Sequence, residues 1–319
     1  MKRYIGWGKE TSGIGTPVAA VVYKDLKSES LVPKRNMAFL GDSRYRSPYR
    51  KVSTAPTIEG NVVCGFVAEP DADMFYYLMG AVGADDGTPI HAGVYQHDIT
   101  PADELSTAFT TRIGVEEYER VIAGCAVTRM QVNMIVREPM LSWTASLLAC
   151  SEAKASLGTP NFGSVGEFQW HQGTISIAGS PNTNVRAVRL NMANSMALDR
   201  MYAIKATGGN KFSRIDAGEF IVDGLLDMYF TGADEYDRFL AETEYALNFK
   251  FEAATIGATD HKYTVEFVLP SCYTDEDSVP HIDTNAPFRL AVPFKALYKS
   301  ADGYIIKTVI TNTEALCPE

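Results

Sequence analysis

The sequence predicts a mainly β protein made of two similar β-sandwich or β-barrel domains, each with one short helix. A strand with alternating apolar residues at 57–66 leads directly into a short amphipathic helix at 71–79. The same unit returns at 219–240, where Ala233-Asp-Glu-Tyr236 is similar to Ala72-Asp-Met-Phe75. The patterns that follow also repeat in the same order, and such self-similarity indicates a duplicated chain.

Each of the two strands places apolar residues on one face, which is expected to face a core. Pro70 ends the first strand because it has no N–H to donate. Asp71 and Asp73 can cap the helix, and Gly80 closes it. The apolar positions of the first strand are Ile58, Val62, Cys64 and Phe66. Those of the second are Phe220, Val222, Leu226, Met228 and Phe230.

The length of 319 residues and the downstream repeats both favour two domains. The segment 118–128 is similar to 263–274, and 139–149 is similar to 287–297. The expected divisions are an N-terminal arm with a basic loop at 1–56, a first domain at 57–155 and a second domain at 156–319.

Residues 1–56 are expected to form an extended arm with few core contacts. Their glycines and Pro17 disfavour a helix. Within this region the segment 43–51, SRYRSPYRK, is basic and aromatic. Such a loop either contacts an acidic neighbour or nucleic acid, or is a solvated surface loop.

Three further segments connect the predicted strands. Residues 81–112 are rich in Gly, Asp, Thr and Pro and are expected to form a long loop that orders only on assembly. Residues 151–165 are expected to be a linker. A hairpin is expected at 167–179 with its turn at Gly173, followed by a strand at 184–191. This hairpin and strand can alternatively complete the first domain.

The charge of the chain excludes some classes of protein. Lys and Arg number 29 and Asp and Glu number 39, which gives a formal net charge of −10. A protein whose main task is to hold nucleic-acid phosphates needs a basic surface, so this balance argues against that role. The five cysteines include no CxxC pair and favour a reducing compartment. The N-terminus lacks the apolar region of a signal peptide, and no apolar run approaches the ~20 residues of a membrane span.

The sequence contains no convincing catalytic or metal site, so we expect neither enzymatic activity nor a cofactor or bound metal. Ser151-Glu-Ala-Lys154 matches S-x-x-K but lacks its partner motifs. His91, His97 and Asp98 can form a metal site, although a solvated loop is the favoured interpretation. The acidic clusters at 116–119 and 275–277 can do acid–base work or bind Ca²⁺, but a solubilising rim is favoured.

Several short segments resemble a known family. They are Gly8-Lys-Glu-Thr-Ser-Gly-Ile-Gly-Thr-Pro17, Glu29-Ser30, Thr57-Ile-Glu-Gly60, Leu78-Met-Gly80, Phe168-x-Trp170, Ile175-x-Ile177-Ala-Gly179 and Asn191-x-x-Asn194. Together they resemble the tail tube proteins (major tail proteins) of long, non-contractile-tailed, siphovirus-type bacteriophages. The likeness covers most of the chain, and its motifs are structural, not catalytic.

The resemblance implies tail-tube-type β-sandwich or barrel domains and a virion structural protein made in the host cytoplasm. In that family, strands of neighbouring subunits close into a barrel around a bore, and stacked rings form a tube that delivers DNA. A duplicated chain then suggests a ring of three with pseudo-sixfold symmetry, or else a ring of six. The implied partners are other copies of the chain, the tape measure, tail terminator and distal tail proteins, and DNA passing transiently through the lumen. No membrane contact is expected.

In such a ring the polar face of the repeated strands is expected to face the lumen, where an acidic wall suits DNA that must slide. The alternative is that these acids face bulk solvent outside. The expected lumen-lining residues are Glu59, Asn61, Glu219, Asp223 and Asp227. The expected inter-subunit residues of the arm are Gly8, Lys9, Glu10, Thr11, Gly13, Gly15 and Pro17, and those of the basic loop are Arg44, Arg46, Arg50 and Lys51.

Three other classes of protein stay open at this point. The first is another virion ring component, such as a tail terminator or head–tail joining protein. The second is an adhesion module of paired β-sandwiches. The third is a hydrolase that uses the carboxylates of Glu116 or Asp275.

Overall fold

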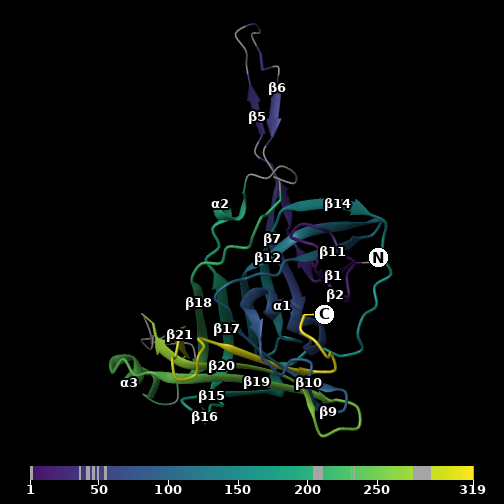
Figure 1. Cartoon of the computed structure of the whole chain (residues 1–319). Helices are drawn as coiled ribbons and strands as arrows, with labels where there is room; N and C mark the ends of the chain where they lie inside the picture. The colour runs from purple at the N-terminus through teal and green to yellow at the C-terminus, as the bar shows by residue number, and fades with distance from the viewer. Residues whose placement is uncertain are drawn as a thin grey trace.

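The computed structural model describes residues 3–35, 37–40, 44, 47–48, 50–53, 56–203, 211–230, 232, 234–275 and 289–318 (Figure 1). Within these residues the chain is mainly β with few helices. The fold class expected from the alternating sequence pattern is therefore confirmed.

A central antiparallel sheet extends across the whole molecule and joins its two halves. The strands follow the order β4, β7, β13, the C-terminal half of β12, β17, β18 and β21, and β3 continues the edge beside β4. Their bounds are β3 Ser28–Glu29, β4 Val32–Lys34, β7 Thr57–Gly65, β12 Tyr118–Ile135, β13 Ser142–Ala149, β17 Val185–Asn194, β18 Phe220–Tyr229 and β21 Arg289–Ala296.

Two outer sheets enclose the core on one side of the central sheet. The first has the order β2, β1, β11, the N-terminal half of β12 and β14. The second has the order β16, β15, β19, β20, β22 and β10, with β8 and β9 beside β10. The bounds are β1 Arg3–Lys9, β2 Val22–Asp25, β8 Gly80–Val82, β9 Pro89–His91, β10 Val94–Pro101, β11 Phe109–Val115, β14 Ser151–Ala155, β15 Gly173–Ile177, β16 Ser180–Pro181, β19 Tyr245–Thr255, β20 Lys262–Thr274 and β22 Lys307–Asn312.

The same strand pairings occur twice along the chain, in the same register. In the first set Phe109 pairs with Cys125, and the register then shifts so that Thr111 pairs with Ile122. In the second set Tyr245 pairs with Cys272, and the same shift brings Leu247 opposite Leu269. The correspondence holds strand by strand. In this order, β1, β4, β7, β11, β12, β13 and β14 correspond to β15, β17, β18, β19, β20, β21 and β22.

Helix α1 (Ala68–Met79) lies in the core between the central sheet and both outer sheets. Its Phe75 ring lies 5.5 Å from that of Phe267 in the second outer sheet, and its Tyr77 ring stacks 4.3 Å from that of Phe109 in the first. The helix begins three residues before the predicted start, and Gly80 ends it with φ of 95° as expected. The other helical segments are η1 Trp170–Gln172, α2 Leu198–Met201 and α3 Asp234–Leu240.

The first turn of α1 holds a buried ion pair. The Lys24 Nζ lies 2.5 Å from the Asp71 Oδ1, and the two side chains are 5% and 0% exposed. The Asp71 carboxylate also accepts a hydrogen bond of 2.7 Å from the backbone N–H of Val67. Val67, and not Asp71 or Asp73, is the N-cap of the helix and its side chain makes no capping hydrogen bond, so the predicted cap is wrong. Burial raises the pKa of this carboxyl, an effect that Lys24 opposes.

The expectation of an extended N-terminal arm with few core contacts is wrong. Strand β1 pairs with both β2 and β11, and its side chains Tyr4, Ile5 and Trp7 are fully buried. The glycines that suggested flexibility permit close packing instead. A Cβ at Gly8 would lie 2.3 Å from the carbonyl oxygen of Ala19, so only glycine fits there.

Three other local expectations are also wrong. Residues 81–112 do not form one long loop but contain β8 to β10 and part of β11, because β10 pairs with the distant β22. The expected linker at 151–165 begins with β14, which pairs with β12. The hairpin near 167–179 turns at Ala178–Gly179, between β15 and β16, and Gly173 is the first residue of β15.

Candidate functional site

The outward face of the central sheet is mainly polar, although the partly exposed Val63, Ile221 and Leu225 also lie on it. Along each strand, buried side chains alternate with side chains on this face, as in the burial of β7, β12, β17 and β18. One row across the sheet, fixed by the pairing register, contains Val63, Thr144, Gln131, Asn191, Asp223 and Lys295. The buried face instead carries Ile58, Val62, Cys64, Trp143, Val132, Leu190, Val222, Leu226 and Phe294.

Four of the five expected lumen residues lie on this polar face, and each of the four has a partner on the face. Glu59 pairs with Lys34, and Asn61 accepts a hydrogen bond of 2.8 Å from the Ser146 hydroxyl. Asp223 accepts one of 2.8 Å from the Asn191 amide, and Asp227 lies 3.6 Å from Arg186. Glu219 is exposed but precedes β18. The predicted parity of both strands therefore matches the observed burial.

The polar face carries positive charges that sequence reasoning missed. Arg129 in β12, Arg189 in β17 and Lys295 in β21 are exposed and share the face with Asp223. The face thus combines both signs of charge and is not uniformly negative. The alternation of Arg129, Gln131 and Asn133 is visible in the sequence, but the prediction of a buried and a polar face covers only the two repeated strands.

The basic loop is part of a hairpin that projects from the body of the molecule (Figure 1). Strands β5 (Met37–Leu40) and β6 (Arg50–Ser53) pair with each other and form their own two-stranded sheet. Arg50 and Lys51 lie on β6 and Arg44 lies in the turn region, whereas Arg46 is outside the described residues. Phe39 is 65% exposed, and Met37, Leu40 and Val52 are exposed too. The hairpin therefore presents apolar and basic side chains together.

The arm residues expected between subunits make contacts within the chain. Gly8 and Lys9 belong to β1. The buried Glu10 carboxylate accepts hydrogen bonds from the N–H of Gly15 (2.6 Å), the N–H of Gly124 (2.8 Å) and the Thr110 hydroxyl (2.8 Å). Gly15 is buried, and the residues left exposed are Thr11, Gly13 and Pro17.

The candidate catalytic and metal-binding groups are dispersed and already have partners. The His97 ring is buried, with Nδ1 2.5 Å from the Asp86 carboxylate and Nε2 3.0 Å from the Asn312 side-chain oxygen. The Glu116 carboxylate faces Arg3, and Ser151 and Lys154 lie on β14. Glu119 accepts a hydrogen bond from Tyr4, and burial together with this carboxylate raises the pKa of Tyr4 to about 12. Among the described residues, no three His, Cys, Asp or Glu side chains are grouped to hold a metal ion.

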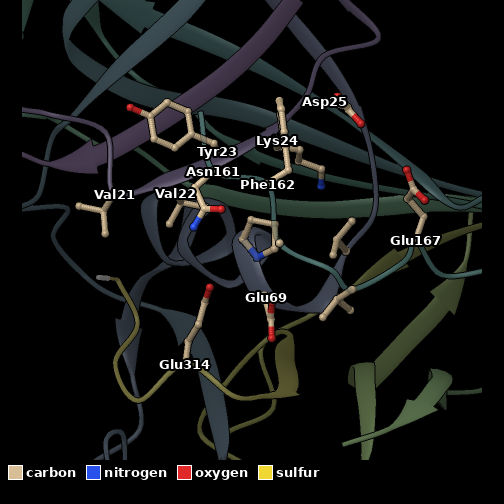
Figure 2. A pocket seen from close by; sticks show the side chains of 14 residues that line it. Val21, Val22, Tyr23, Lys24, Asp25, Glu69, Asn161, Phe162, Glu167 and Glu314 are labelled. Carbon is tan, nitrogen blue, oxygen red and sulfur yellow. The ribbon is translucent and has the colours of Figure 1, made fainter. Parts of the chain in front are cut away.

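A surface pocket of about 300 Å³ lies beside the first turn of α1 (Figure 2). Figure 2 shows the carboxylates of Glu69, Glu167 and Glu314 around it. Glu69 accepts hydrogen bonds from the Tyr263 hydroxyl (3.2 Å) and the Thr313 hydroxyl (2.6 Å). These contacts give Glu69 a role in joining α1 to the second half of the chain, and the pocket supplies no paired nucleophile and base.

A family model described as "Phage tail tube protein" matches residues 2–296, nearly the whole chain. The chain belongs to the phage tail tube protein family. No curated protein matches it. Membership in this family makes it a structural component of a phage tail, and the resemblance to phage tail tube proteins inferred from its short motifs is confirmed. In the described part of this tail tube protein, no helix is long and apolar enough to cross a membrane.

Proposed function

We propose that this protein is the repeating subunit of the tail tube of a siphovirus-type phage. Three copies close into a ring, rings stack into a tube, and DNA is delivered through the bore. The protein is made in the host cytoplasm and functions in the tail of the virion. Its expected partners are its own copies, the tape measure, tail terminator and distal tail proteins, and DNA in transit.

The observation that carries this proposal is the pairing of β12 with β17. This pairing places the second strand set beside the first in one continuous sheet, from Arg129 opposite Ala193 to Ile135 opposite Ala187. Because β4 corresponds to β17, the same junction can be repeated between the second strand set of one copy and β4 of the next. In the described residues β4 pairs only with β7, so its other edge is available. Closing a sheet into a barrel removes such edges.

The duplication also supports two tube-type domains, with β1 and β4 of residues 1–56 belonging to the first domain and not to a separate arm. The polar face of the central sheet then becomes the wall of the bore, with Glu59, Asn61, Asp223 and Asp227 beside Arg129, Arg189 and Lys295. A wall with both signs of charge offers DNA few net attractive contacts. The exposed hairpin β5–β6, with Arg50 and Lys51, is suited to a contact between successive rings.

Electron microscopy of the purified protein tests this proposal. We expect rings and tubes whose end-on class averages have threefold symmetry at the level of whole chains. Particles that stay monomeric at high concentration would contradict a tube role. Single rings that never stack would favour a tail terminator or joining protein, and six chains in a ring would overturn the trimer.

A further inference from the structure

The contact between the two halves of the chain includes one polar link at the end of a helix. The Asn194 side-chain N–H donates a hydrogen bond of 2.7 Å to the carbonyl oxygen of Leu78, in the last turn of α1. Carbonyls at the C-terminal end of a helix lack partners within the helix, so this amide satisfies one of them. Asn194 is the last residue of β17 and comes from the second strand set.

The repeat fixes which residue corresponds to Asn194 in the first strand set. Gly60 and Gly224 both lie against a carbonyl of the adjacent strand, that of Ser30 and that of Arg189 respectively. Glu59, the residue before Gly60, pairs with Val32, and Asp223, the residue before Gly224, pairs with Asn191. Val32 therefore corresponds to Asn191. Arg35 lies three residues after Val32 and Asn194 lies three residues after Asn191, so Arg35 corresponds to Asn194.

Helix α3 corresponds to α1 in its packing as well as in its place in the chain. The Tyr77 ring of α1 stacks on Phe109, the residue that pairs with Cys125. The Arg238 guanidinium of α3 lies 5.9 Å from the ring centre of Tyr245, the residue that pairs with Cys272. Asn194 contacts the end of α1, so the residue that corresponds to Asn194 would contact the end of α3 in the same way. Figure 1 places α3 at one side of the molecule, away from the hairpin that follows Arg35.

We infer that, in the ring, α3 of one copy lies against the β3–β4 edge of the next copy, with Arg35 directed at the C-terminal end of α3. This inference rests on the proposed ring and names its contact surfaces. The partner is a second copy of the chain, and the intrachain contact of Asn194 with α1 is the template. The positions that would pair with β4 in the neighbour follow β20 and lie outside the described residues.

The chemistry of the two surfaces is complementary. A guanidinium suits the last turn of a helix because the carbonyls there carry partial negative charge. The α3 segment Asp234-Glu-Tyr-Asp-Arg-Phe-Leu240 has three acids and one base, Arg238 in its last turn. The opposing edge ends in Arg35, which follows the Lys34 that pairs with Glu59. Leu240 on α3 is 62% exposed and Val32 on β4 is 56% exposed, so the contact would also cover two apolar side chains.

A cysteine cross-linking experiment tests the contact. The variant Arg35→Cys with Leu240→Cys places one thiol on each surface, and all five native cysteines are buried and do not compete. Assembled rings treated with a short bifunctional thiol reagent should yield covalent species of two and three chains and nothing larger. The matched control, Arg35→Cys with Leu316→Cys, uses another exposed leucine that the repeat does not place at the junction and should stay monomeric on the gel.

Absence of cross-links in rings of the Arg35→Cys, Leu240→Cys variant would overturn the contact while leaving the ring intact. In rings of three chains, a ladder that continues beyond three chains would also overturn it, since that pattern then requires a contact between rings. If the unmodified chain forms no rings at all, the proposed function itself fails. The two failures are therefore distinguishable.

Discussion

Gly60 in β7 and Gly224 in β18 lie at corresponding positions of the two strand sets, Gly60 against the carbonyl oxygen of Ser30 between β3 and β4 and Gly224 against that of Arg189 in β17. A Cβ at Gly60 would lie 2.3 Å from the Ser30 oxygen, and one at Gly224 would lie 2.4 Å from the Arg189 oxygen. Both distances are shorter than real contacts between a Cβ and a non-bonded atom. Each carbonyl can therefore approach this closely only because the glycine has no side chain.

Alanine at either glycine should force the two strands apart. We expect Gly60→Ala and Gly224→Ala each to lower the free energy of unfolding by about 1–3 kcal/mol, the usual range for overpacking. Gly166→Ala is the control, because nothing lies within 4 Å of a Cβ there. It should change stability by less than ~0.5 kcal/mol. Urea unfolding measures all three, and equal stability of Gly60→Ala and the parent would contradict the close approach.

The N-terminal residues should be needed for folding, not only for assembly. Trp7 is fully buried on β1, and its indole N–H lies 3.3 Å from the Asp73 carboxylate. Trp7→Ala should therefore cost about 3–5 kcal/mol, and deletion of residues 1–9 should prevent folding. Circular dichroism and thermal unfolding test both, with the exposed Thr11→Ala as a neutral control. A truncated chain with an unchanged melting temperature would restore the interpretation as a detachable arm.

Stability should fall in alkaline solution because buried thiols resist ionisation. Burial raises the pKa of Cys64, Cys125 and Cys272 to about 12 from an ordinary value of 9.0. The unfolded chain therefore releases these protons first, and stability present below pH 9 is lost as pH rises toward 12. Each thiol contributes a slope of about 1.4 kcal/mol per pH unit.

The alkaline loss can be assigned by removing the thiols. Replacing Cys64, Cys125 and Cys272 by alanine should flatten the fall in unfolding free energy between pH 9 and 11. Stability at pH 7 serves as the reference, since the substitutions also remove packing there. An unchanged slope in the triple variant would show that other groups, such as Tyr4, govern the alkaline limit.

The β5–β6 hairpin should serve stacking and not folding. Residues 37–40 and 50–52 are exposed on a sheet of their own, so replacing 37–53 by a short Gly-Ser linker removes none of the core side chains that the structure describes. The shortened chain should keep its melting temperature and form rings that do not extend into tubes. Negative-stain microscopy gives the result, and normal tubes from this variant would exclude the hairpin from the ring–ring contact.

Charge on the polar face should control DNA passage. Asp223→Lys with Asp227→Lys replaces two negative charges per chain by two positive ones on the proposed bore wall, and each cation gives phosphates a contact. Tube assembly should be spared, and phage carrying the change should release DNA more slowly in an ejection assay. Arg129→Gln with Arg189→Gln is the opposing control and should not slow release. Normal ejection by the lysine variant would place these residues outside the bore.

Local alternation in the sequence predicted the two repeated strands and their buried faces, because burial in a strand has a period of two. It could not predict that β12 pairs with β17 or β10 with β22, since those partners are set by packing between distant segments. Strand β1 was missed because Gly6 and Gly8 interrupt its apolar pattern, although they are what lets residues 19–23 pack against it. Arg129 and Arg189 were missed because the strands beside the repeat were not assigned a face.

The pairing of β12 with β17 inside one chain has a consequence for the concentration at which a ring can form. If the two strand sets were separate polypeptides, a six-membered ring would depend on the sixth power of free subunit concentration. Because each folded chain already contains one of every two junctions, the formation of a ring of three chains depends on the third power of the free chain concentration. The link also fixes equal amounts of both halves, so dissimilar segments of the central sheet, such as those with Val32 and Asn191, would alternate around the proposed ring without any sorting step.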